Sequence, residues 1–161
     1  MISLERFINF FKKIILTDRS PKKLAIAFCV GVFIAFSPFF GFHTVMTIFA
    51  AWYFQLNFAV LYAAAHIFNN PWTMVPLYMS DYIAGLKIFS FFGVDPHAWG
   101  NPCWADWLNC KLTYYIGLPK ISFWAFIIGG NVLGLVVSLA LYPLIIRIFR
   151  RILAHSEESR S

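Results

Sequence analysis

The sequence predicts an all-α, polytopic helical membrane protein with broken or re-entrant helices, preceded by an N-terminal amphipathic interfacial helix. The first observation is composition: of 161 residues, 60% are hydrophobic and only 12% are charged, whereas a soluble domain carries about 25% charged residues. The second is the stretch from Leu24 to Ser80, which contains no Asp, Glu, Lys or Arg. As a helix it would be about 85 Å long, between two and three hydrocarbon thicknesses.

The third observation is that two polar, proline-bearing islands interrupt this stretch. We call residues 37–44 (SPFFGFHT) the first island and residues 69–76 (NNPWTMVP) the second island. Each island divides its apolar run into arms that are shorter than the roughly 20 residues of a membrane span. Apolar runs of about 10–14 residues are often re-entrant, so the islands favour broken or re-entrant helices.

Residues 1–20 are predicted to form the amphipathic interfacial helix. Polar residues such as Lys12 and Lys13 recur on one face and Phe and Ile fill the other, a pattern typical of helices that lie in the membrane interface. A cytosolic helix packed on the rest of the domain is the alternative.

The membrane domain is predicted over residues 21–152. N-cap and first-turn signals, Ser20 before Pro21 and Asn70 before Pro71, mark two helix starts, and Pro76 is expected to bend or interrupt the second of these helices. Small residues at Gly129, Gly130 and Gly134 permit close helix packing. The apolar segments are 24–42, 44–68, 71–92 and 121–146, the second of them interrupted by a polar notch at Gln55 and Asn57, and a disordered polar tail is predicted over 153–161.

Residues 93–120 are predicted to be an extracytoplasmic loop, because they are aromatic and balanced in charge. Both ends of the chain are basic, so both termini are expected in the cytoplasm, which requires an even number of crossings. Four full spans satisfy this, and so do two spans plus two re-entrant hairpins tipped by the islands. Cys103 and Cys110 either form a disulfide or, if their segment is helical, lie about 10 Å apart.

The net charge of +6 arises largely from basic residues at the flanks of the apolar segments. Such flanks indicate contacts with anionic lipids of the bilayer rather than with nucleic acid. The sequence has no spaced carboxylate pair, metal-ligand motif or phosphate-binding glycine loop. Enzyme activity is therefore poorly supported, and no catalytic residue, cofactor or metal is predicted.

Irregular backbone at membrane depth must be satisfied by protein or must line a wet cavity, and paired proline-interrupted segments indicate ligand sites. Half-helix N-termini at the islands would suit an anion. The alternative is that these polar groups only cap and connect the broken helices. Asp81 is the one acid within an apolar segment, either intramembrane or at the interface with Lys87. The candidate ligand-lining residues are Ser37, Pro38, Gly41, His43, Thr44, Asn57, Asn69, Asn70, Pro71, Thr73, Tyr78 and Asp81.

The residues around both islands resemble the signature of a bacterial membrane family catalogued as domain of unknown function 2062. The similarity lies in Gly31–Thr44, in Leu56-Asn57, and in Asn70-Pro71-Trp72-Thr73 with Pro76 and Tyr78. It implies a multi-pass protein of the bacterial inner membrane. Some family members look fused to glycosyltransferase-like domains, which implies an envelope pathway.

Two functions are therefore expected. The first is transport or handling of a small anionic or lipid-linked envelope substrate through the broken helices, in a homo-oligomer because so few spans rarely enclose a path. The alternative is a non-catalytic accessory or anchoring subunit that partners an envelope glycosyltransferase through an exposed face, with the Gly129–Gly134 helix as the candidate face.

Overall fold

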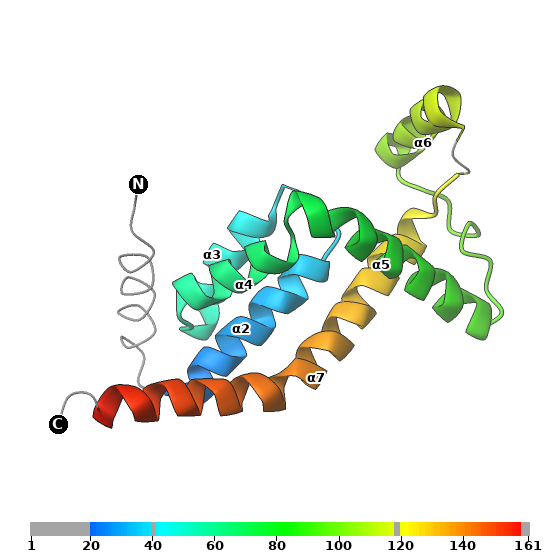
Figure 1. Cartoon of the computed structure of the whole chain (residues 1–161). Helices are drawn as coiled ribbons and strands as arrows, with labels where there is room; N and C mark the ends of the chain where they lie inside the picture. The colour runs from blue at the N-terminus through cyan, green and yellow to red at the C-terminus, as the bar shows by residue number, and fades with distance from the viewer. Residues whose placement is uncertain (1–19, 40, 118–119, 159–161) are drawn as a thin grey trace.

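We describe a computed structural model of the chain over residues 20–39, 41–117 and 120–158. This part of the chain contains helices and no strands, which confirms the all-α prediction. Figure 1 shows their arrangement, with α6 standing apart from the other helices. The helices are α2 (Pro21–Phe36), α3 (His43–Phe54), α4 (Phe58–Phe68), α5 (Pro71–Phe91), α6 (Cys103–Ile116) and α7 (Phe123–Glu158). The predicted interfacial helix over residues 1–20 lies almost wholly outside the described residues.

Helix α2 is the centre of the bundle. Its N-terminus has the predicted cap, in which Ser20 accepts a hydrogen bond from the Lys23 amide and Pro21 takes the first helical position. The helix ends at Phe36, just before the Ser37-Pro38 pair, because the residue before a proline disfavours helical backbone. Helix α2 packs against α7 on one side and α4 on the other.

Helices α3 and α4 form a short antiparallel hairpin. The predicted segment 44–68 is therefore two helices, separated at the polar residues Gln55 and Asn57. Gln55 ends α3 in the left-handed conformation (φ 51°), and Asn57 caps α4 by accepting from the Val60 amide. The tip of the hairpin is this turn, and the two islands lie together at its open end. The first island connects α2 to α3, and the second connects α4 to α5.

Helix α5 begins at the second island and continues through Pro76 to Phe91, so the proline does not interrupt it. Glycines let α5 pack closely on α7. A Cβ added at Gly85 would lie 1.8 Å from the carbonyl oxygen of Ala125, and one added at Gly129 would lie 1.9 Å from that of Asp81. Any side chain at these positions would force the two helices apart.

Helix α7 has 36 residues and is the one described helix that is long and apolar enough to cross a membrane. Only 17% of its most apolar 18-residue window is buried, unlike the core helix of a soluble protein. It extends beyond the predicted boundary at 146 and continues through residues 153–158, which were predicted to be disordered. It changes direction in Figure 1 near Pro143, which interrupts the helical hydrogen bonds.

The segment 93–120, predicted as a loop, contains helix α6. Cys103 and Cys110 are both on this helix, exposed and not bonded to each other. Of the two alternatives for this pair, the structure has the helical one, in which seven residues of helix separate the thiols by about 10 Å.

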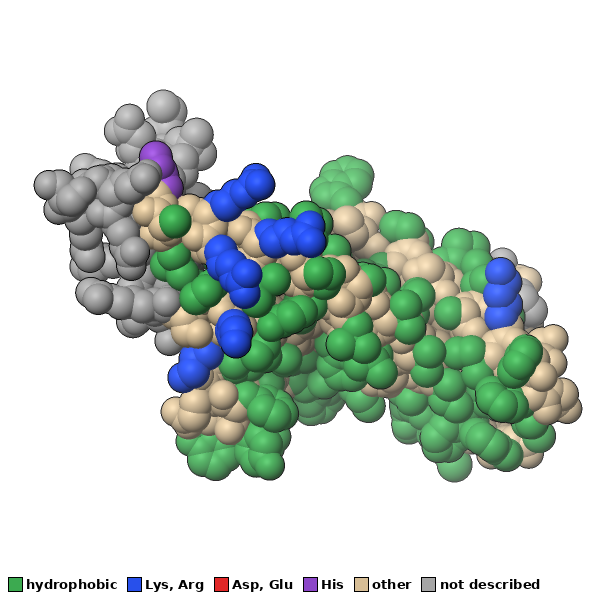
Figure 2. All heavy atoms as spheres, turned by 90° about the horizontal axis from the view of Figure 1, so that it is seen from below, with side chains coloured by type: hydrophobic (Ala, Val, Ile, Leu, Met, Phe, Trp, Pro, Cys, Tyr) green, Lys and Arg blue, Asp and Glu red, His purple; other side chains and the backbone are tan. Residues whose placement is uncertain are grey.

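The surface of the molecule is unusually apolar. Large hydrophobic side chains are exposed along α3, α5 and α7, including Phe49, Trp52, Val75 and Leu139, which are between 59% and 68% exposed. In Figure 2 hydrophobic side chains cover most of the face, and Lys and Arg side chains gather at one end. The start of α2 and the last part of α7 pack together. Their exposed basic residues are Lys22, Lys23, Arg147, Arg150 and Arg151.

Candidate functional site

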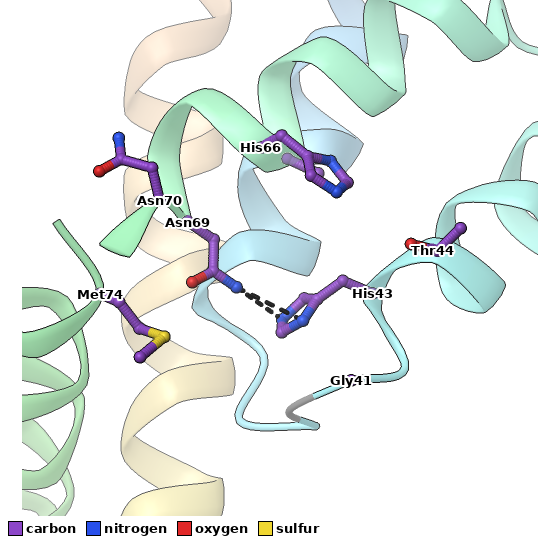
Figure 3. A pocket seen from close by; sticks show the side chains of 8 residues that line it. Gly41, His43, Thr44, His66, Asn69, Asn70 and Met74 are labelled. Atoms are coloured by element: carbon purple, nitrogen blue, oxygen red, sulfur yellow. Dashed lines mark hydrogen bonds between the residues drawn. The ribbon is translucent and has the colours of Figure 1, made fainter. Parts of the chain in front are cut away.

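A cavity of about 330 Å³ lies between the two islands (Figure 3). The first island contributes Gly41, His43 and Thr44, and the second contributes Asn69, Asn70 and Met74. Helix α4, which joins the hairpin to the second island, adds Ala65 and His66. Residues from the two islands, about 30 positions apart in the sequence, are thus brought to one place by the antiparallel hairpin.

The second island is held by its own side chains. The side-chain oxygen Oδ1 of Asn70 accepts hydrogen bonds from the backbone amides of Trp72 (2.9 Å) and Thr73 (3.1 Å), and the Thr73 hydroxyl accepts one from the backbone N–H of Asn70 (3.2 Å). This is a capping box, which satisfies exposed N–H groups at a helix start. The same hydroxyl also lies 2.8 Å from the Phe68 carbonyl oxygen. Asn70 and Thr73 therefore fix the turn between α4 and α5.

His43 connects the first island to the second. Its Nε2 atom lies 2.9 Å from the carbonyl oxygen of Ser37. Because a carbonyl can only accept, Nε2 carries the hydrogen, which leaves Nδ1 as the acceptor for the Asn69 amide at 3.4 Å. The Asn69 amide also donates to the Tyr78 hydroxyl at 3.4 Å. Figure 3 shows Asn69 reaching across the cavity wall to the His43 ring.

The electrostatics of the cavity favour an anion. No Asp or Glu is among its lining residues. The carbonyl end of α4 is already occupied, since Asn69, Asn70 and Thr73 donate to the carbonyls of Ala65, Ile67 and Phe68. Helix α3, by contrast, starts at the cavity and its N-cap residue Phe42 makes no side-chain cap. The first-turn N–H groups of a helix attract negative charge.

Asp81 lies outside this cavity, at the contact between α5 and α7. It is fully buried, and neither carboxyl oxygen has a hydrogen-bond partner among the described residues. The carboxyl carbon would lie 3.4 Å from a Cβ added at Gly130 of α7. An interfacial pairing with Lys87 is not formed.

A second cavity, of about 500 Å³, is apolar and lies on the other side of the first island. Pro38, Phe39 and Phe42 line it together with side chains of α6 and of the start of α7, among them Leu108 and Phe126. Asn109 holds this corner, because its side chain hydrogen-bonds both the amide and the carbonyl of Ile121. Sequence reasoning gave no role to Asn109 or to α6.

The structure divides the predicted site residues into three groups. Gly41, His43, Thr44 and Asn70 line the cavity between the islands, and Thr73 and Tyr78 hydrogen-bond residues that line it. Ser37, Pro38 and Asp81 lie where the end of α2 packs against α7, near Gly130. Pro71 takes the first position of α5. Asn57 caps the far end of α4, eleven residues or about 16 Å away, and does not reach the cavity.

Ala65, His66 and Met74 were missed as lining residues. Met74 is inside the second island and Ala65 lies four residues before it, so the antiparallel pairing of α3 and α4 is the signal that would have found them. Among the described residues, no group of three or more His, Cys, Asp or Glu side chains could hold a metal ion.

Comparison with known proteins identifies the family of the chain. A family model described as "Uncharacterized protein conserved in bacteria (DUF2062)" matches residues 4–158. The chain belongs to the DUF2062 family. This confirms the resemblance carried by the two islands and extends it over nearly the whole chain. No curated protein and no solved structure gives a match.

In this DUF2062 protein the family resemblance and the cavity coincide. The motifs that carried the resemblance, residues 31–44 and 70–78, supply most of the cavity wall and the His43–Asn69–Tyr78 contacts.

Proposed function

We propose that this DUF2062 protein is a multi-pass protein of the bacterial inner membrane that transports or handles a small anionic or lipid-linked envelope substrate. The cavity between the islands is the observation that carries the proposal. It would hold the anionic group of the substrate at the N-terminus of α3, with the side-chain N–H of Asn70 that does not donate to Ile67 as a further donor.

The membrane setting is supported by length, apolarity and charge. Residues 123–142, before the bend of α7 at Pro143, would span about 30 Å as a helix. The following segment carries Arg147, Arg150 and Arg151, which suit the cytoplasmic surface with its anionic lipids. Helix α2 packs on α7 with its basic start at the same end, so the two helices form one pair of crossings.

The hairpin of α3 and α4 suits a re-entrant element. Each helix has only 11 or 12 residues, about 17 Å of helix, which is roughly half of the hydrocarbon thickness. Its open end carries the cavity, and its exposed aromatic side chains suit lipid. A polar site bounded by broken helices is the arrangement expected of a substrate site in a membrane.

The native cysteines can test this topology. Cys103 and Cys110 are exposed on α6, which the proposal places outside the cytoplasm, and Cys29 is only partly buried on α2. In spheroplasts a membrane-impermeant maleimide should label Cys103→Ser and Cys110→Ser single variants but not the Cys103→Ser/Cys110→Ser double variant. Labelling of neither single variant before lysis, with full labelling after it, would contradict the topology.

Substrate binding can be tested with a matched pair of lipids. Undecaprenyl phosphate and undecaprenol differ only in the phosphate, so quenching of tryptophan fluorescence in detergent should show tighter binding of the phosphate form. Loss of one hydrogen bond to a charged group costs about 1.5 kcal/mol, or roughly tenfold in affinity. Asn70→Ser, which keeps an oxygen for the helix cap but removes the amide donor, should therefore weaken binding about tenfold, and His97→Ala, in an exposed loop, should not. Equal binding of the two lipids would refute an anion site.

The alternative function is an accessory or anchoring subunit for an envelope glycosyltransferase. Gly129, Gly130 and Gly134 of the predicted docking helix are buried against α5 and α2, so the docking face of this helix would be its other side, which exposes Val132 and Leu135. The exposed aromatic face of α3, with Phe49, Trp52 and Tyr53, is a second candidate. Co-purification of a glycosyltransferase that depends on Trp52 but not on His43 would favour this alternative.

A further inference from the structure

Besides the side-chain oxygen of Asn69, three oxygen atoms of the described interior lack the hydrogen-bond partners that buried polar atoms normally have. Asp81 is fully buried and Ser37 is 1% exposed. Within the described part of the chain, neither carboxyl oxygen of Asp81 nor the hydroxyl oxygen of Ser37 has a hydrogen-bond partner. Buried polar groups are nearly always hydrogen-bonded, and a buried charge is costly unless something neutralises it. These oxygens therefore point to a missing ligand.

The oxygens of Ser37 and Asp81 lie where the end of α2 packs against α7. A Cβ added at Gly130 would lie 2.6 Å from the Phe36 carbonyl oxygen and 3.4 Å from the Asp81 carboxyl carbon, so both groups border the same point of α7. Ser37 is the next residue of the chain. Phe36 is the last residue of α2, and the final carbonyls of a helix have no helical donor and carry partial negative charge.

This set of atoms matches a small, hard, monovalent cation. All of the available ligands are oxygens, which hard cations prefer. The single carboxylate supplies one negative charge, and no Lys, Arg or His of the described chain forms an ion pair with it. In transporters, carbonyl ends of broken helices coordinate sodium ions in the same way.

We propose that Asp81, Ser37 and the carbonyl end of α2 at Phe36 form a binding site for one sodium ion. The site lies beside the inter-island contacts, since Tyr78 is one turn before Asp81 on α5 and accepts from Asn69, which contacts His43. Sodium binding would thus stabilise the end of α2 against α7 on one side of the substrate cavity. This inference goes beyond the proposed function and does not depend on which anion the cavity binds.

The test is the sodium dependence of stability. The full chain, purified in detergent without added lipid, is unfolded by heat at constant ionic strength while NaCl replaces choline chloride. Because a ligand that binds only the folded state stabilises it, the midpoint should rise and then saturate with sodium for the wild type. Asp81→Asn should abolish the rise. Ser37→Ala should shift the sodium concentration for half of the effect upward by about tenfold, equivalent to roughly 1.4 kcal/mol.

Asp95→Asn is the matched control, since Asp95 is in an exposed loop, and it should keep the full sodium response. An identical midpoint in NaCl and choline chloride for the wild type would overturn the proposal. A sodium response that persists unchanged in both Asp81→Asn and Ser37→Ala would overturn it as well. If Asp81→Asn fails to fold, the wild type and Ser37→Ala decide the question. Because no lipid is present, failure here is distinct from failure of undecaprenyl phosphate to bind.

Discussion

In the second island, Asn70 and Thr73 hydrogen-bond the backbone within five residues of themselves, so the start of α5 is stabilised locally. In the first island, His43 bonds the Ser37 carbonyl and contacts Asn69 from 26 residues away, and α3 has no side-chain cap. Both islands break an apolar helix with a proline and polar residues. The helix start at the second island is capped by its own side chains, whereas the start of α3 has no side-chain cap and is available to a ligand.

This difference predicts that substitutions which disturb the surroundings of the first island cost more stability than those within the second. The substitutions below are ordered by the size of their expected effect. Each is to be measured on protein in mixed detergent and SDS micelles, with tryptophan fluorescence to follow unfolding.

Gly130→Val should have the largest effect, a loss of about 3 kcal/mol, at the upper end of the usual cost of overpacking. Its side chain would meet the Phe36 carbonyl and Pro38, the entry to the first island. Ala140→Val, on the exposed side of the same helix, is the control and should change stability by less than about 0.5 kcal/mol. Equal effects of the two substitutions would show that α2 does not need this close contact.

His43→Ala should destabilise the protein by about 2 kcal/mol, because it leaves buried polar groups at Ser37 and Asn69 without their partner. His97→Ala removes an exposed imidazole and should have no measurable effect. If His43→Ala proved as stable as the wild type, the link between the islands would contribute nothing to the fold.

Asn70→Ala should cost about 1 kcal/mol, the usual loss on removing an N-cap. Asn70→Ser keeps an oxygen that can accept from the first turn of α5 and should restore most of this loss. A cost well above 2 kcal/mol would mean that the second island also depends on distant contacts.

The smallest expected effect is the coupling between the islands. The double variant His43→Ala/Thr73→Val should lose the sum of the single losses within about 0.5 kcal/mol, because the two side chains share no hydrogen bond. A larger coupling energy would show that the capping box and the His43 contacts act as one unit, and would remove the distinction between the islands.

The sequence by itself determined the helical class, the N-caps at Ser20 and Asn70, the polar notch at Gln55 and Asn57, and the family. These features depend on local chemistry: a capping side chain, a proline or a left-handed turn acts within four residues of itself. Helix α6 and the last turns of α7 were not predicted, because their charged and aromatic residues fit a polar loop or tail as well as a helix.

The tertiary structure alone decided which island residues meet. The antiparallel hairpin of α3 and α4 brings His43 to Asn69 and sends Asn57 to the opposite end, a result that follows from where the chain reverses and not from residue type. It also decided which helices meet at the glycines predicted to allow close packing, since α5 and α2 approach α7 at Gly129 and Gly130, and that Asp81 is buried there. Close packing between helices distant in sequence sets these positions, and no local pattern encodes it.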